Sequence, residues 1–324
     1  MTATTEVLMN TEQPVGSVAE LWRFPVKSML GERLDTVELT GTGIAGDRAY
    51  AIFDPATGKV ASAKHPRLWP DMFGCRATFV APPRPGEPPP PARIELADGT
   101  VVRTDAPGAD DVLSRFFGRE VRLISASPEK YLIDEYHPDL EHLNPQGDRD
   151  VVVDQPLGAA LFGALGRPSV VPPGALVDLF PLSVLATSSL RRFAELEPDG
   201  EWDTRRFRMN VIVETPGTTF ADNAWVGGNL AFGTGAALDV AVPTPRCVMT
   251  NLALDELPRN PRMLKAAAAH NRLDILGLGL YPCAGVYAVP TAPGPIHIGD
   301  QVRLTSGGRT PGTDRELTPD EAPS

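Results

Sequence analysis

The chain has 324 residues, and this length predicts about two domains. Hydrophobic residues make up 42% and charged residues 22%, which is typical of an ordinary soluble globular protein. The formal net charge of −11 argues against a nucleic-acid or an anionic-membrane partner, because such partners require clustered Lys and Arg.

The first part of the chain predicts a β domain. Residues 1–16 are expected to be disordered because they offer little apolar surface to bury. Short β-type runs separated by Gly, Pro and Asp then predict an antiparallel, β-barrel-like domain over residues 17–125. Asp-Gly within residues 97–100 indicates a hairpin turn. The seven prolines of residues 82–91 suit a stiff loop between strands, with an SH3-type ligand as the alternative.

Residues 126–175 are poorly periodic and are predicted to form an irregular connection into a second domain. Within them, Glu135, His137, Glu141 and His142 resemble a loose set of metal ligands. Their spacing matches no helical ligand pair such as His-Glu-x-x-His, so a solvated acidic loop is the favoured interpretation.

The second domain is predicted over residues 176–304, followed by a disordered tail over residues 305–324. A strand-like run at residues 177–186 leads into a helical pattern at residues 190–196. Hydroxyl side chains between them can cap the helix, and its free backbone N–H groups can bind an anion. Further elements are predicted as a helix near residues 262–270 and as strands at residues 211–214, 236–242, 285–289 and 298–304.

Two features of this domain indicate a candidate binding or catalytic site: a cluster of arginines and a cysteine that follows an arginine. Three arginines within residues 205–208 precede a strand, and guanidinium groups match phosphate bidentately, although a solvated edge is the alternative. Cys247 follows Arg246 between a proline-stiffened strand end and a short apolar run. The arginine favours the thiolate, which binds metals or attacks electrophiles, whereas burial as a small hydrophobe is the alternative from this segment alone.

The three cysteines are widely spaced and fit no disulfide framework, zinc site or iron–sulfur pattern. Cys75 and Cys283 are expected in the core. A Cys–His dyad of Cys247 with His65, His270 or His297 stays open, although nothing local orients any of these histidines. Neither a targeting segment nor an apolar run of about 18 residues is visible, so a cytoplasmic location and no membrane span are expected.

Eight short segments, in this order along the chain, are FPVKS (24–28), GDR (46–48), AKHPRL (63–68), TSSL (187–190), FRMN (207–210), PRCVMT (245–250), GVY (285–287) and IGD (298–300). With these segments the chain resembles MOSC domain proteins that carry an N-terminal β-barrel domain, and it is similar to the mitochondrial amidoxime-reducing component and its bacterial relatives. The resemblance implies a mostly β protein with some helix: an N-terminal antiparallel β-barrel-like domain plus a β-barrel MOSC domain decorated with helices.

The resemblance also implies a molybdenum cofactor, Mo-molybdopterin, with Cys247 as the catalytic residue and as the protein's metal ligand. Membership of the superfamily further allows pyridoxal phosphate binding. The cofactor-binding positions carried over from the family are Lys27, Ser28, Arg48, Thr187, Ser188, Ser189, Arg208, Asn210 and Arg246.

The implied reaction is the two-electron reduction of an N-hydroxylated (N-oxygenated) small molecule. Electrons would come from an external flavin or iron–sulfur donor protein, because this sequence shows neither fingerprint. A persulfide-carrying sulfur-transfer protein and a non-catalytic cofactor carrier are the alternatives. The sequence departs from the family at residues 251–256, where NLALDE replaces an acidic Asp-Pro-x-x-Gly stretch, and this affects the substrate pocket and the donor surface most.

Overall fold

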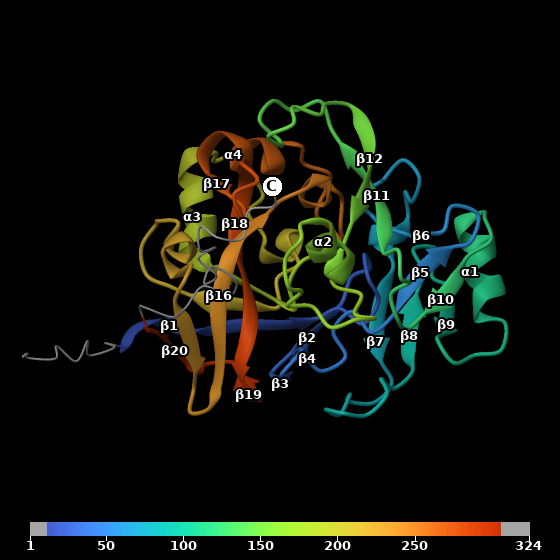
Figure 1. Cartoon of the computed structure of the whole chain (residues 1–324), viewed down its shortest axis with the longest axis horizontal. Coiled ribbons are helices and arrows are strands. Elements are labelled where there is room, and N and C mark those ends of the chain that lie inside the picture. Colours follow the sequence, from blue (N-terminus) through green and yellow to red (C-terminus); the bar gives the residue numbers. More distant parts are fainter. Residues whose placement is uncertain (1–11, 306–324) are drawn as a thin grey trace, which may run out of the picture.

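The computed structural model describes residues 12–305, which fold mostly as β structure with four α-helices (Figure 1). A large barrel lies on the left of the view, small sheets and α1 lie on the right, and a hairpin stands above them. The predicted fold class is confirmed. No helix within the described range is long and apolar enough to cross a membrane.

Seven strands close into the barrel, because the last of them pairs back onto the first. Every one of the seven strands contributes side chains to a single buried core, as expected for strands whose alternate residues face inward. In barrel order they are β13 (Leu182–Ala186), β14 (Val211–Glu214), β1 (Glu12–Arg23), β20 (Gln301–Thr305), β15 (Asn229–Phe232), β16 (Ala236–Pro245) and β18 (Leu280–Ala292).

The ends of the described chain correct two predictions. Disorder is predicted through residue 16, but β1 begins at Glu12. The disordered tail is predicted to begin at residue 305, but Thr305 belongs to β20 and pairs with Glu12. Backbone hydrogen bonding to a neighbouring strand orders these residues without large apolar side chains. β1 also belongs to the barrel of the second domain, although it is predicted as the first strand of the first. Residues 1–11 and 306–324 lie outside the described range.

Small antiparallel sheets form the N-terminal part, around a core that includes Trp69, Met72 and Leu113. The hairpin at residues 97–100 is confirmed, and the proline-rich segment is a loop between two strands, tied down where the Tyr50 hydroxyl donates to the Pro90 carbonyl at 3.2 Å. The elements are β2 (Glu32–Leu34), β3 (Thr36–Thr40), β4 (Gly43–Ile44), β5 (Ala51–Asp54), β6 (Lys59–Val60), η1 (Met72–Gly74), β7 (Arg76–Phe79), β8 (Ala92–Glu95), β9 (Val101–Arg103), α1 (Ala109–Phe117) and β10 (Arg122–Ile124).

The connection over residues 126–175, predicted as irregular, instead contains two strands and a helix. β11 (Leu132–His137) and β12 (Val151–Pro156) form an antiparallel hairpin, and α2 (Gly158–Ala164) follows directly. Val151 and Val152 are exposed, so the apolar residues of β12 do not alternate as a half-buried strand requires. Pairing with β11 therefore stabilises a strand that its own pattern does not predict.

Helices cover one side of the barrel. α3 (Thr187–Leu196) crosses between the parallel strands β13 and β14, and its Phe193 packs in one cluster with Met263 of α4 (Arg262–His270), whose predicted position is confirmed. The predicted strand at residues 177–186 starts only at residue 182. The remaining elements are η2 (Thr204–Phe207), η3 (Ala221–Trp225), η4 (Val248–Asn251), β17 (Arg272–Asp274) and β19 (Gly294–His297).

Candidate functional site

A polar cavity of about 100 Å³ lies between the N-terminal part and the barrel. Its walls come from loops after β1, from the segment after β6, from the start of β13 and from the end of β16. Segments far apart in the sequence therefore meet at one place. The predicted site residues that line this cavity are Lys27, Ser28, Arg48, Arg208, Asn210, Arg246 and Cys247.

Three of these residues hold a left-handed backbone conformation. The φ angles are 65° at Ser28, 49° at Arg48 and 53° at Arg208. A residue other than glycine in this region costs on the order of 1–3 kcal/mol and persists only where the surroundings fix it, typically at ligand clamps. The coincidence of three such residues on one cavity indicates a built binding site.

Two of the strained residues place their guanidinium groups on the same aromatic ring. Arg48 lies 4.5 Å and Arg208 4.3 Å from the ring centroid of Phe24. Burial lowers the pKa of Arg208 to about 9, and the neighbouring positive charge of Arg48 adds to the lowering. Two cations held this closely favour an anion beside them.

A lysine pair extends the positive wall. Lys27 contacts the Asp178 carboxylate, and the Lys64 ammonium lies 3.0 Å from the same carboxylate and 3.3 Å from Glu135. Burial lowers the pKa of Lys27. For Lys64, burial acts in the same direction, but Asp178 and Glu135 outweigh it and raise the pKa well above its usual value. The two lysines hold the pKa of Asp178 far below its usual range against the effect of burial.

Cys247 is half-buried two residues after the end of β16, at the N-cap of η4. Burial raises the pKa of its thiol, while Lys64 and, to a smaller extent, Arg246 lower it. The expected effect of Arg246 is therefore present but outweighed. The Arg246 side chain also bonds elsewhere, since its Nη2 donates to the Phe207 carbonyl at 2.7 Å.

Asn210 lines the cavity but uses its amide to position the structure. Its Oδ1 accepts from the Ser183 hydroxyl at 3.1 Å, and its Nδ2 donates to the Asp47 carboxylate at 3.0 Å. Because Asp47 also contacts the Arg48 guanidinium, the amide links β13 to the strained turn at Arg48. Asn210 thus holds the binding arginine in place.

The cavity fits an anionic ligand. Its lining holds one carboxylate, Asp178, among five cations. Two polar atoms at its wall, Thr244 Oγ1 and Arg246 Nε, are buried without a hydrogen-bond partner among residues 12–305. Such atoms are uncommon unless a ligand or water satisfies them. The five cations are Lys27, Arg48, Lys64, Arg208 and Arg246.

The predicted residues Thr187, Ser188 and Ser189 do not reach this cavity. Ser188 accepts a hydrogen bond from the Thr215 hydroxyl at 2.8 Å, and Ser189 donates to the Asp222 carboxylate at 2.7 Å. Both serines are fully buried. Thr215, just after β14, and Asp222 of η3 thus engage the serine hydroxyls at the start of α3, and no side-chain cap forms there.

The buried Asp222 carboxyl predicts a pH-dependent stability. Burial raises its pKa to about 6, so the folded state favours the protonated form, and this stabilisation is lost as pH rises from about 4 through 6. The Asp222→Asn substitution removes the titration. The free energy of unfolding of this variant, relative to that of the unmodified protein, should rise by about 2 kcal/mol between pH 4 and pH 7, measured by urea titration. Parallel pH profiles would contradict the expectation.

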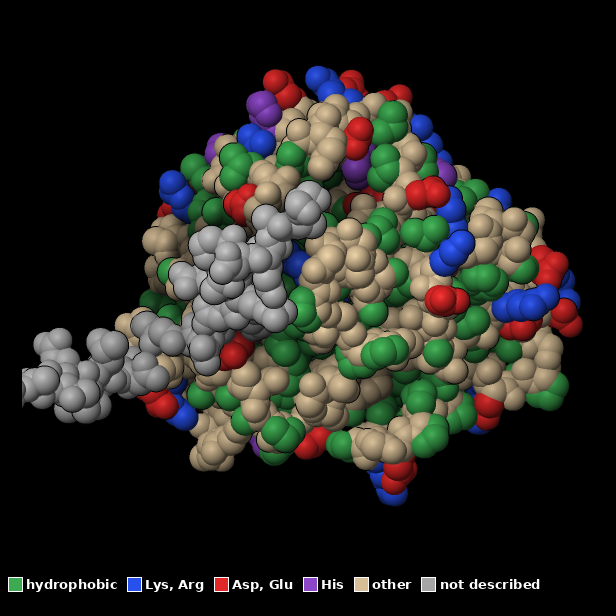
Figure 2. Space-filling view, in the orientation of Figure 1, with side chains coloured by type: hydrophobic (Ala, Val, Ile, Leu, Met, Phe, Trp, Pro, Cys, Tyr) green, Lys and Arg blue, Asp and Glu red, His purple; other side chains and the backbone are tan. Residues whose placement is uncertain are grey.

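A second, larger cavity of about 440 Å³ adjoins the first at Cys247. The hairpin β11–β12, α2 and the turn after β17 supply its walls. Figure 2 shows this face hollowed beneath the loop between β11 and β12, with acidic and histidine side chains in the recess. The residues shared by both cavities are Lys64, Asp178, Pro245, Arg246, Cys247 and Tyr287.

Lys64, Asp178 and Tyr287 are missing from the sequence-predicted site. Lys64 and Tyr287 fall in the AKHPRL and GVY segments that carried the resemblance, and this was the available signal. No such sequence signal pointed to Asp178, because it lies outside every segment that carried the resemblance. Burial raises the pKa of Tyr287 to about 12, which keeps its hydroxyl protonated between the two cavities.

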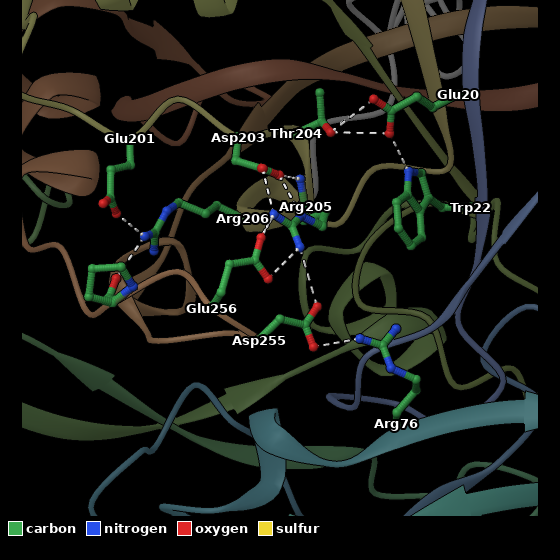
Figure 3. A network of polar contacts seen from close by, with 11 residues as sticks. Glu20, Trp22, Arg76, Glu201, Asp203, Thr204, Arg205, Arg206, Asp255 and Glu256 are labelled. Carbon is green, nitrogen blue, oxygen red and sulfur yellow. Dashed lines mark hydrogen bonds and ion pairs between the residues drawn. The ribbon is translucent and has the colours of Figure 1, made fainter.

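The other two arginines of residues 205–208 serve the structure (Figure 3). Arg206 is fully buried and donates to the carbonyls of Leu252 at 2.9 Å and Pro258 at 2.7 Å. Arg205 pairs with Glu256 at 2.6 Å. Together they fix the segment that follows Cys247 and η4, so the divergent residues 251–256 have defined partners.

Removing the Arg206 head group should destabilise the fold. Arg206→Met removes the donor to two backbone carbonyls and breaks the ion pair of a fully buried guanidinium with Glu201, and we expect a loss of about 2–5 kcal/mol in the free energy of unfolding. Arg205→Met, which breaks a more exposed pair, should cost less than about 1 kcal/mol. Chemical denaturation of both variants measures the difference, and equal losses would argue against this role for Arg206.

The loose metal-ligand set does not assemble. Among residues 12–305, no group of three His, Cys, Asp or Glu side chains is placed to hold a metal ion. Glu135 pairs with Lys64, and His137 Nδ1 lies 2.9 Å from Asn144 Nδ2. His65, His270 and His297, the histidines considered as partners for the Cys247 thiol, lie outside both cavities, so among residues 12–305 none of them forms a Cys–His dyad with Cys247.

Comparison with protein families identifies the class. Residues 15–117 match the MOSC N-terminal beta barrel domain, and residues 174–303 match the MOSC domain. The two matches together span more than half of the sequence. The chain therefore belongs to the MOSC domain proteins that carry an N-terminal beta barrel domain, a family commonly associated with the molybdenum cofactor.

No curated protein matches this chain. Among solved structures, the YuaD protein of Bacillus subtilis is 12% identical with a TM-score of 0.42, and the alignment covers 91% of this chain and 98% of that one. YiiM of Geobacillus stearothermophilus is 16% identical with a TM-score of 0.28, and YiiM of Escherichia coli is 17% identical with a TM-score of 0.27. Each YiiM alignment covers 39% of this chain and 55% of the other.

Proposed function

We propose that this protein is a molybdenum-cofactor-dependent reductase of N-hydroxylated compounds, with Cys247 as the molybdenum ligand. The observation that carries the proposal is the strained, cation-rich cavity beside a single thiol at the edge of a larger pocket. A thiolate is a soft ligand suited to a metal–dithiolene centre, and a pterin phosphate needs cations.

In this proposal, Arg48 and Arg208 hold the anionic part of the cofactor, and Lys27 adds charge. The unpartnered Thr244 hydroxyl and Arg246 Nε supply further donors. The bound cofactor would supply the two-electron redox chemistry. The protein would contribute binding, orientation and a site screened from water.

The overall reaction breaks the N–O bond of the substrate and forms an N–H bond, with two electrons and two protons consumed and one water released. The electrons come from a separate flavin or iron–sulfur protein. The reductase itself acts in the cytoplasm. The Lys64 ammonium lies between the two cavities, where it can orient the substrate's oxygen by a charge-assisted hydrogen bond.

Metal analysis tests the proposal directly. The protein, purified from a host that makes the cofactor, should contain close to one molybdenum per chain. It should also reduce benzamidoxime with reduced methyl viologen as an artificial donor. Absence of molybdenum would sink the proposal, whereas molybdenum without reduction of any N-hydroxylated compound would favour a cofactor carrier. Sulfur added to Cys247 by a desulfurase, seen as a mass increase in metal-free protein, would favour sulfur transfer.

A further inference from the structure

The larger cavity has an apolar wall that the cofactor site does not use. Its volume of about 440 Å³ is well above the roughly 150 Å³ that encloses a benzene molecule, and it lies in the usual range for small-molecule sites. A ligand here can therefore carry an apolar body larger than a single ring. The leucines of the wall are Leu143, Leu157, Leu161, Leu165, Leu179, Leu276 and Leu278.

One stretch of this wall is held in a strained conformation. Leu276 has a φ of 56°, which a bulky residue rarely adopts. Its carbonyl accepts from Arg167 at 3.0 Å, while the Asp274 carboxylate accepts from the backbone of Gly277 at 2.7 Å. A Cβ on Gly279 would lie 2.5 Å from Pro145, so the turn packs tightly against the loop of the hairpin. The wall is thus fixed by its surroundings.

The end of the cavity near Cys247 is polar and offers a hydrogen-bond acceptor. Glu135 is largely buried, and its ion-pair partner among residues 12–305 is Lys64 at 3.3 Å, a long contact. Lys64 is shared with Asp178 at 3.0 Å. The Glu135 carboxylate therefore keeps acceptor capacity toward the cavity, and a ligand carrying N–H groups can use it.

We propose that this cavity binds the apolar body of the N-hydroxylated substrate, and that Glu135 receives N–H groups of its nitrogen-bearing head beside Cys247. The inference rests on the proposed function and narrows its substrate class. Compounds that combine an amidine-type head with an alkyl-aryl body are selected. Small hydrophilic hydroxylamines and carboxylates of the same size are disfavoured, the latter because Glu135 repels them.

Binding of non-reducible product analogues tests the apolar wall without turnover. Calorimetry with the molybdenum-loaded protein should show that 4-hexylbenzamidine binds at least about 30-fold more tightly than benzamidine, the gain expected when two or three carbons of the hexyl chain leave water. Leu161→Gln should remove most of this gain. The matched control Leu280→Gln should retain it, since Leu280 is exposed and lies outside the cavity lining. Equal affinity for both amidines would overturn the assignment.

The acceptor is tested separately. Glu135→Gln should weaken the binding of 4-hexylbenzamidine by about 10-fold and strengthen the binding of 4-hexylbenzoate. The control Glu141→Gln, in the exposed loop of the hairpin, should change neither affinity. If Glu135→Gln leaves both affinities unchanged, Glu135 does not select the head group. If short hydroxylamines are reduced and activity does not depend on the length of the substrate's alkyl chain, the inference alone is refuted. If binding depends on alkyl-chain length but no N-hydroxylated compound is reduced, only the proposed function is refuted.

Discussion

Replacing Cys247 by serine is expected to abolish the reduction of N-hydroxylated compounds and to deplete molybdenum. Serine provides a hard oxygen with a high pKa where the proposed metal requires a soft thiolate. The loss should exceed the roughly 10–100-fold that removal of an outer-shell partner costs. Elemental analysis and benzamidoxime reduction measure the two effects, and circular dichroism checks the fold.

The two other cysteines provide controls for this variant. Cys75 and Cys283 are fully buried, and burial raises the pKa of their thiols to about 11 and about 12. Cys75→Ala should therefore keep its molybdenum and lose only the stability expected for a small core cavity. Full activity and metal content in the Cys247→Ser variant would show instead that Cys247 is an ordinary packing residue.

Local sequence signals predicted the elements whose causes are local. The hairpin at residues 97–100 depends on Asp-Gly, because Gly99 has a φ of 84° and the Asp98 carboxylate accepts from Thr100 at 2.8 Å. α4 is likewise amphipathic within its own nine residues. Residues 12–16 of β1 and the strand β12 were missed because partner strands order them, and this information is absent from the segments themselves.

For the residues that line the cavity, sequence predicted the segments better than the direction of individual side chains. The segments that meet at the cavity were found, and the resemblance selected Arg208 among the three neighbouring arginines. Composition alone did not distinguish Arg208, which lines the cavity, from Arg206, which is buried in a structural network. The left-handed backbone of Arg208 decides this direction. The hydroxyls opening α3 were a plausible anion site until Thr215 and Asp222, far along the chain, supplied their partners.

We expect Arg208 to bind the proposed cofactor and, at the same time, to lower the free energy of unfolding of the cofactor-free protein. Its left-handed backbone and its closeness to Arg48 both disfavour the cofactor-free fold. We expect Arg208→Met, which removes the charge, to stabilise the cofactor-free protein by about 1–3 kcal/mol at pH 7. Arg208→Gly should add about 1 kcal/mol by relieving the backbone. Both variants should lose most of their molybdenum.

The pH dependence identifies the electrostatic part of this gain. The folded-state pKa of Arg208 is lowered to about 9, so the penalty for its charge is complete below that pH and declines as pH rises above it. The advantage of Arg208→Met over the unmodified protein should therefore shrink above pH 9 in urea titrations of cofactor-free protein. His142→Gly is the matched backbone control, because His142 has a φ of 65° on an exposed loop. It should gain stability with unchanged molybdenum, and a destabilised, fully loaded Arg208→Met variant would remove Arg208 from the proposed cofactor site.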